Sequence, residues 1–240
     1  MAGNVPRRPA STGRARAKGR SPTRAPARPR PVRSEALASR YMRAVLSGDR
    51  LKASDLLVKA VEAGGLSAPE CYERVLAPVQ RELGKRWREG ASSIADERVG
   101  LDSARMVMDR LYPSVRRARP ARRVVIVACV QGNTHELGAR MVADIFEASG
   151  WKAVFLGVDV PASEVAAAAQ AARAHLVALS AASPEHITAT ANTIARVRRL
   201  PNPPRTLVGG PAFTGDADWK ATGADAYAGT AAEAVQIAAA

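Results

Sequence analysis

The sequence predicts an α/β protein in which an N-terminal four-helix bundle precedes a doubly wound, parallel, five-stranded sheet. Two observations predict this fold. From Ser34 to about Leu111, apolar residues recur at helical spacing, and the connections between the helical segments are short. From Val124 onward, short β-branched runs alternate with helical segments, which is typical of a parallel sheet with right-handed crossovers.

Four amphipathic segments make up the predicted bundle, and they span residues 35–47, 50–63, 67–87 and 93–112. Ser67 stands three residues before Glu70, which is the capping-box arrangement at the start of a helix. We expect the fourth helix to begin after Ser93 and to end at Tyr112, because proline follows. The expected buried face of the third helix carries four apolar residues at four-residue spacing: Val75, Val79, Leu83 and Trp87.

Five short apolar runs make up the predicted sheet, and they span residues 124–130, 153–157, 176–182, 205–210 and 225–229. The first run, VVIVACV, is continuously apolar and rich in β-branched residues, as a strand covered on both faces requires. The predicted organisation is a basic tail (1–34), a helical bundle (35–115), a basic linker (116–123) and an α/β domain (124–240).

The net charge of +14 is concentrated in two segments. The first 34 residues carry ten basic residues and no acidic one, and residues 116–123 carry five more. Outside them, 21 basic residues face 22 acidic ones, so the predicted folded parts are close to neutral. The tail lacks the apolar groups that offset ordering entropy, and we expect it to be disordered. A solvated tail, a weak phosphate-binding arm and a transit peptide stay open as its role.

The apolar runs are too short to span a bilayer, and the N-terminus has no signal-peptide pattern. Cys71 and Cys129 stand far apart and form neither a disulfide framework nor a zinc signature. We therefore expect a cytoplasmic protein without a membrane segment, in which both cysteines are core residues.

Small and polar residues follow the ends of several predicted strands. Parallel doubly wound sheets bind ligands beyond the carboxyl ends of their strands, so these residues are expected to share one crevice. His135 follows the first strand, at the start of a helical segment. On position alone, His135 is as well explained as a helix-start residue, and the glycines as turns.

The motifs NTHELG (133–138), LSAAS (179–183), LVGG (207–210) and GADAYAGTAAEAV (223–235) together resemble the cobalamin-binding domain of methionine synthases, corrinoid methyl carriers and CarH-type photoreceptors. The resemblance covers about residues 123–235, and extends with lower specificity over the bundle as a cap on the cofactor. It implies a flavodoxin-like fold, and His135 as the lower ligand to cobalt in place of the cofactor's own base. The displaced nucleotide tail is expected in the sheet crevice.

The resemblance and the strand ends together give the expected cofactor-binding residues: Trp87, Glu97, Gly132, Asn133, Thr134, His135, Leu137, Gly138, Ser180, Ala182, Gly209, Gly210, Gly229 and Thr230. A neutral imidazole suits cobalt, and its second ring nitrogen needs an acceptor. The family places an aspartate two residues before the histidine. Asn133 stands there in this sequence; its amide oxygen can accept the bond from the ring but cannot take up a proton.

Two departures from the family bear on activity. Asn133 and Ala139, the latter where many methyl carriers have lysine, weaken the methyl-carrier interpretation, and the chain has no barrel of the size that a cobalamin mutase needs. An enzymatic role is therefore disfavoured. Trp87 and Glu97 have the spacing of the tryptophan and glutamate that cover the adenosyl group in CarH-type receptors. Arg88 and Arg98 stand where those receptors have histidines, so a bis-histidine light adduct is not expected.

The sequence thus favours a cobalamin sensor, light-responsive through adenosylcobalamin, that signals to a protein partner. No helix-turn-helix pattern occurs in the first 34 residues, so we do not expect a complete CarH-type repressor in this chain. Three alternatives stay open: a corrinoid methyl-carrier subunit, a photocobilin in which a bilin joins cobalamin, and a nucleic-acid binder acting through its tail. A homo-oligomer is expected from the exposed faces of the bundle.

Overall fold

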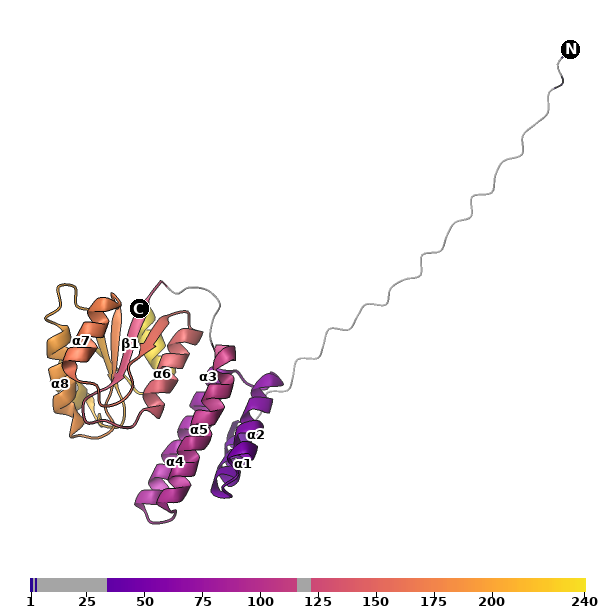
Figure 1. Cartoon of the computed structure of the whole chain (residues 1–240), viewed down its shortest axis with the longest axis horizontal. Coiled ribbons are helices and arrows are strands. Elements are labelled where there is room, and N and C mark those ends of the chain that lie inside the picture. The colour runs from indigo at the N-terminus through magenta and orange to yellow at the C-terminus, as the bar shows by residue number, and fades with distance from the viewer. Residues whose placement is uncertain (2, 4–33, 116–121) are drawn as a thin grey trace.

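The computed structural model describes residues 1, 3, 34–115 and 122–240 (Figure 1). Most of the predicted tail and residues 116–121 of the predicted linker lie outside the described residues. The helices of the first part are α1 (Ser34–Leu46), α2 (Arg50–Glu62), α3 (Ala68–Cys71), the π-helical turn η1 (Tyr72–Leu76), α4 (Ala77–Arg88) and α5 (Ile94–Val115).

The second part alternates strands with helices, as the sequence predicts. Its elements are β1 (Val124–Cys129), α6 (Leu137–Ala148), β2 (Lys152–Phe155), α7 (Ala162–Ala171), β3 (Leu176–Ser180), α8 (His186–Val197), β4 (Arg205–Gly209), α9 (Asp216–Ala221), β5 (Ala226–Ala228) and α10 (Ala231–Ala239). All strand pairs are parallel, and the strand order is β2-β1-β3-β4-β5. The predicted doubly wound sheet is therefore confirmed, and the chain reverses its direction of progress across the sheet between β1 and β3.

Helices cover both faces of the sheet. Alternate residues of β1 point to opposite faces: Ile126 packs in one core with α7 and α8, and Val127 packs in the other with α6 and α10. Both β1 residues are almost completely buried, which explains why this strand is a continuous apolar run.

The bundle forms as the capping and periodicity predict. Ser67 and Glu70 make both bonds of the capping box. The helical path from α3 through α4 is continuous, and η1 inserts a π-helical turn into it. The predicted end of α5 at Tyr112 is wrong: the helix continues through Pro113 to Val115. Proline removes only one backbone donor so near the helix end, and the Ser114 hydroxyl donates to the Leu111 carbonyl at 2.6 Å.

The bundle lies against α6, so its core continues into the α/β part (Figure 1). Leu137, Met141 and Ile145 of α6 share one buried cluster with the bundle helices, including Val107 and Leu111 of α5. Among the described residues, no helix has the length and apolar character needed to cross a membrane.

Candidate functional site

The β1–α6 turn carries His135, and Asn133 fixes its shape. Asn133 is completely buried; its side-chain Nδ2 donates to the carbonyl of Ser180 at 2.9 Å, joining the ends of β1 and β3. Its Oδ1 accepts the backbone N–H of His135 at 3.0 Å. No bond from the His135 ring to this oxygen is among the hydrogen bonds of the described residues; because an amide oxygen can accept two bonds, the bond from the ring stays a prediction.

A residue from a third strand end also holds this turn. Asp159, between β2 and α7, accepts the backbone N–H of Gly132 through Oδ1 at 2.7 Å and donates its own N–H to the Asn133 carbonyl at 3.0 Å. Gly132 has φ +86°, a conformation that suits glycine, while Asp159 itself has φ +51°. Asp159 is not among the predicted site residues; its only local signal is an aspartate soon after a predicted strand.

His135 projects from this fixed turn with an exposed side chain. Its backbone carbonyl accepts a long hydrogen bond from the Cys129 thiol, with Sγ and O 3.6 Å apart. Burial raises the pKa of the Cys129 thiol to about 11, and the Glu136 carboxylate adds to the rise, so this cysteine stays protonated and is a poor metal ligand. The described residues contain no cluster of three or more His, Cys, Asp or Glu side chains suited to a metal ion. His135 therefore offers a single protein ligand.

Two glycines at the end of β4 make close backbone contacts. A Cβ on Gly210, which has φ +108°, would lie 2.2 Å from the Ala181 carbonyl oxygen, and one on Gly209 would lie 2.8 Å from the Ala228 carbonyl oxygen. Neither position accepts a side chain without backbone movement. Gly138 differs, because a Cβ there would have no other group within 4 Å. The backbones of β3, β4 and β5 therefore lie too close together at Gly209 and Gly210 for a side chain, whereas the space beside Gly138 at the start of α6 is open.

The other predicted residues on the α/β part have mixed environments. Leu137 is buried against the bundle, so it has a packing role. Thr230 caps α10 by accepting the backbone N–H of Glu233 at 3.1 Å, and the Glu233 carboxylate accepts the N–H of Gly229 at 2.8 Å. Thr134, which is exposed, and Ser180 and Ala182, which are partly exposed, are accessible to a ligand at the strand ends.

A second histidine lies beside the turn, and the sequence analysis missed it. His186, the first residue of α8, is only 7% exposed. Its Nδ1 accepts the backbone N–H of Ser183 at 3.2 Å, which assigns the proton of the neutral ring to Nε2. The edge of the ring lies against Gly132, where an added Cβ would be 3.4 Å from its Cδ2. His186 thus packs the loop after β3 against the turn that carries His135.

The tip of the bundle, residues 87–94, does not pack as predicted. Trp87 is 47% exposed and Ile94 is 49% exposed, so the expectation that Trp87 lies on a buried helix face is wrong. Glu97 forms an ion pair with its neighbour Arg98, with 3.8 Å between carboxylate and Nε. The hydrogen bonds and ion pairs of the described residues do not join Trp87 or Glu97 to the β1–α6 turn.

The tip nevertheless projects over the side of the sheet that carries His135. Arg105 of α5 contacts Glu136, the residue after His135, with Nη2 and Oε1 2.7 Å apart. Ile94 lies eleven residues before Arg105 on the same helix, which places the tip about 16 Å beyond this contact. Figure 1 shows the same arrangement, with the α4–α5 turn extending past the α/β part.

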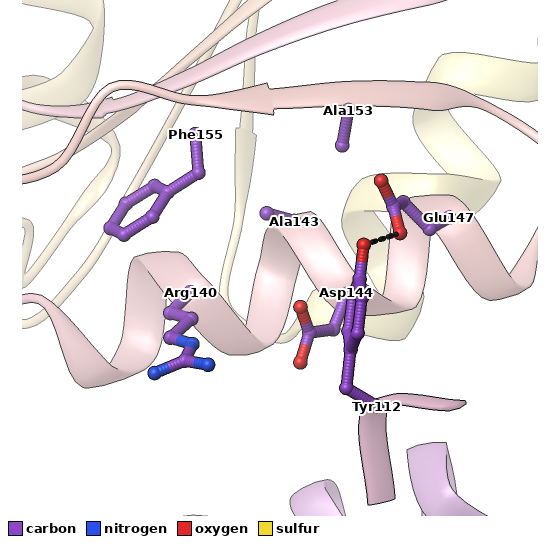
Figure 2. Close-up of a pocket in the computed structure, with 7 residues that line it drawn as sticks. All are labelled: Tyr112, Arg140, Ala143, Asp144, Glu147, Ala153 and Phe155. Atoms are coloured by element: carbon purple, nitrogen blue, oxygen red, sulfur yellow. Dashed lines mark hydrogen bonds between the residues drawn. The ribbon is translucent and has the colours of Figure 1, made fainter. Parts of the chain in front are cut away.

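The structure also has a cavity of about 250 Å³ beside α6, lined from Arg140 in the first turn of this helix to Glu147 in its last (Figure 2). Its lining residues are Tyr112, Arg140, Ala143, Asp144, Glu147, Ala153 and Phe155. Burial raises the pKa of Asp144 to about 6, although Tyr72, whose hydroxyl donates to it at 3.2 Å, and Arg140 both lower it. Tyr112 donates to Glu147 at 2.8 Å. This cavity lies between the bundle and the α/β part; its lining includes Phe155, the last residue of β2, but no residue of the β1–α6 turn that carries His135.

Comparison with known proteins supports the resemblance. Residues 123–239 match the B12 binding domain family, and residues 37–112 match a second family model with the same description. The chain is 29% identical to the HTH-type transcriptional repressor CarH of Myxococcus xanthus over 199 residues, which are 76% of this chain and 63% of CarH. It is 25% identical to a corrinoid protein of Desulfitobacterium hafniense, over 84% of this chain and 95% of that protein.

A solved structure has the same fold. The monomethylamine corrinoid protein of Methanosarcina barkeri superposes with a TM-score of 0.75 at 22% identity, covering 85% of this chain and 98% of that protein. At this identity the likeness concerns the fold, and it includes the helical part as well as the sheet. The two matched segments account for most of the described chain, one in the bundle and one in the α/β part. Residues 123–239 therefore belong to the B12 binding domain family, and residues 37–112 to a second family of the same description.

Proposed function

We propose that this chain binds cobalamin with His135 as the lower ligand to cobalt, and that it acts as a sensor of the group above cobalt. The observation that carries the proposal is one exposed imidazole on a turn tied to two neighbouring strand ends, without companion ligands among the described residues. A corrinoid would bring most of the ligands of its own cobalt. Such a metal would need one protein ligand, and this turn offers His135.

The surroundings of His135 fit a corrinoid in two further respects. The open space beside Gly138 leaves room for a bulky group at the start of α6. The end of β4 exposes backbone rather than side chains at Gly209 and Gly210, which suits a nucleotide tail passing close to the chain. Ser180, at the end of β3, is partly exposed and offers a hydroxyl to that tail.

The sensor role rests on the tip of the bundle. Trp87 and Ile94 are two large apolar side chains left half exposed at the overhang above the His135 rim. We infer that Trp87 and Glu97 cover the upper ligand, with adenosylcobalamin as the native cofactor. Because a ligand shifts a conformational equilibrium only through differential contacts, loss of the adenosyl group in light would release the tip. We propose that a protein partner or a second copy of the chain reads this change.

A methyl-carrier role is the competing proposal. It is favoured by the similarity to a corrinoid protein over 95% of that protein's length, whereas the match to CarH spans 63% of the repressor. The bonds of Asn133 argue against it, because this side chain is committed to the backbone of Ser180 and His135 and cannot accept a proton from the ring. A bilin as second chromophore and a DNA-binding role of the tail have no support among the described residues.

The deciding experiment is absorbance spectroscopy of the purified protein with adenosyl-, methyl- and hydroxocobalamin, in the dark and after green light, followed by size-exclusion chromatography. We expect a histidine-ligated spectrum with each cofactor, and a change of elution volume on illumination with adenosylcobalamin. Binding without any light-dependent change of size or shape would favour the methyl carrier. Failure to bind any cobalamin would refute both roles.

A further inference from the structure

The ion pair between Arg105 and Glu136 joins the bundle to the residue next to His135. Glu136 is the N-cap residue of α6, a position whose side chain usually bonds the first N–H groups of its own helix. Here it makes no such bond, and its carboxylate meets Nη2 of Arg105 at 2.7 Å. The side chain thus serves contact with the bundle rather than the helix start.

Arg105 is held from its other side as well. Its Nη1 lies 3.7 Å from Asp102 Oδ1 on the preceding turn of α5, and Asp102 Oδ2 lies 3.6 Å from Arg50 at the start of α2. The Arg105 Nε is buried and has no hydrogen-bond partner among the described residues. A buried donor without a partner is unfavourable, so the contact with Glu136 must offset that cost for the guanidinium to stay here.

Two further side-chain contacts between α5 and α6 follow this ion pair along the two helices. Four residues farther along each helix, Asp109 pairs with Arg140, so the sign of the charges is reversed relative to the first pair. A slip of one turn in one direction would bring Arg105 to Arg140, and in the other direction Asp109 to Glu136. Both put like charges together, so the alternation disfavours a slip of about 5.4 Å. Tyr112 and Glu147 continue the series toward the far end of α6.

On the inner side, the backbone of His135 is already fixed by Asn133 and Cys129. We propose that Arg105 and Glu136 are positioning residues for His135: their ion pair sets the height of the bundle tip above the cobalt ligand, so that ligation by His135 and docking of the bundle depend on each other. The proposal rests on the proposed cobalamin site. Coupling of this kind is reciprocal, so a cofactor that ligates His135 firmly should also hold the bundle more firmly.

The test measures hydroxocobalamin affinity and the histidine-ligated absorbance spectrum of four variants. Glu136→Gln and Arg105→Gln should each weaken binding about 10-fold, as loss of a partner that orients a metal ligand usually does. Arg105→Gln does not change the sequence of α6, so a loss of affinity in this variant cannot come from a local effect on the start of that helix. The double variant should be no weaker than either single variant, and the reversed pair, Arg105→Glu with Glu136→Arg, should recover most of the affinity.

The matched control is Asp109→Asn, which removes one carboxylate from the next ion pair without touching the β1–α6 turn. It should change affinity by less than about twofold. An effect equal to that of Glu136→Gln would overturn the proposal, as would a reversed pair that folds but does not recover. Hydrogen exchange without cofactor is the independent measurement: Glu136→Gln should speed exchange in residues 132–138, and Asp109→Asn should not. Unchanged exchange in the Glu136→Gln variant would overturn the positioning role, and this measurement does not need a bound cofactor. Failure of the wild-type protein to bind cobalamin would separately refute the proposed function.

Discussion

The two halves of the candidate site differ in how much of their structure is already fixed. The β1–α6 turn is tied to the ends of β2 and β3 by hydrogen bonds from Asp159 and Asn133. Among the described residues, the α4–α5 turn makes only local bonds, such as that between the Ser93 backbone N–H and the Asp96 carboxylate at 2.8 Å, and it leaves Trp87 and Ile94 half exposed. The contrast shows that the β1–α6 turn is preformed, whereas under the proposed function the α4–α5 turn would gain its packing from the ligand bound there.

The largest effect should come from filling the preformed side. Gly210→Ala forces a side chain into a left-handed backbone conformation and against the Ala181 carbonyl, so we expect a loss of about 4 kcal/mol in the free energy of unfolding. Chemical denaturation checks this value. Gly138→Ala is the control, since the space there is open. A loss below about 1 kcal/mol for Gly210→Ala would show that this strand end is not rigid.

Removing the ligand itself should affect binding more than folding. His135→Ala should weaken hydroxocobalamin binding by about 100-fold, or about 2.7 kcal/mol, and abolish the histidine-ligated spectrum. Thermal stability without cofactor should be nearly unchanged, because the side chain is exposed. His186→Gln, at the buried second histidine, is the contrasting variant: it should lower stability while the histidine-ligated spectrum persists. If His186→Gln abolished the histidine-ligated spectrum and His135→Ala did not, His186 would be the ligand and His135 would not.

A substitution at Asp144, whose carboxylate accepts a hydrogen bond from Tyr72 of the bundle, tests the packing of the bundle on α6 without changing the tip. Four groups face this carboxylate: Tyr72 from η1, Asp109 from α5, and Arg140 and Glu147 from α6. The pKa of this carboxyl group is raised to about 6 in the folded state and is near 4 in the unfolded state. The stability contributed by the protonated group is therefore complete below pH 4 and is lost as the pH rises through 6. Asp144→Asn should therefore stabilise the protein by about 2 kcal/mol at pH 8 and by little at pH 4.

Urea denaturation of both proteins across this pH range measures the difference. Cofactor affinity of the Asp144→Asn variant at pH 8 should stay within about twofold of the wild type, because the β1–α6 turn is not altered. A stability difference that does not depend on pH would show that Asp144 is not the titrating group.

The tip should respond only to the upper ligand. Trp87→Ala should weaken adenosylcobalamin binding by about 10-fold, because the indole loses apolar contact, and leave hydroxocobalamin binding and thermal stability nearly unchanged. Isothermal titration in the dark checks both affinities. Leu51→Ala, at a residue that is 69% exposed on α2, is the control for a general effect of removing a surface apolar group. Equal weakening with both cofactors would place Trp87 outside the upper site.

The smallest effect is expected from the N-terminal segment. Removal of residues 1–33 should leave cobalamin affinity unchanged and abolish any salt-sensitive affinity for DNA, because ten basic residues go with it. Fluorescence anisotropy with a labelled duplex at two salt concentrations, beside a cobalamin titration, measures both. Loss of cobalamin binding would contradict the proposed division of the chain.

The sequence predicted the fixed half of the site better than the variable half. The apolar run 124–130 and the helical pattern after His135 are local signals, so the strand, the turn and the following helix could be predicted. Asp159, His186 and Arg105 could not, because each meets the turn through the tertiary fold, at separations in sequence of 27, 54 and 31 residues.

The error at Trp87 has a geometric cause. Residues four apart on an α-helix differ by about 400° of rotation, so each step drifts by about 40°. Val75, Val79 and Leu83 stay within the buried face, but Trp87 has drifted about 120° from Val75. Four-residue spacing therefore predicts burial over two turns and misleads over three.

The π-helical turn η1 affects the direction in which Trp87 points. A π-helical turn holds one residue more than an α-helical turn, and each residue of a helix adds about 100° of rotation. Deleting one residue within Tyr72–Leu76 would restore a regular helix from Ala68 to Arg88, but it would rotate α4 by about that angle against α3. Tyr72 could keep its bond to Asp144, while Trp87 would point in a different direction. The deletion of one residue in η1 can thus change the orientation of Trp87, the residue proposed to cover the upper ligand.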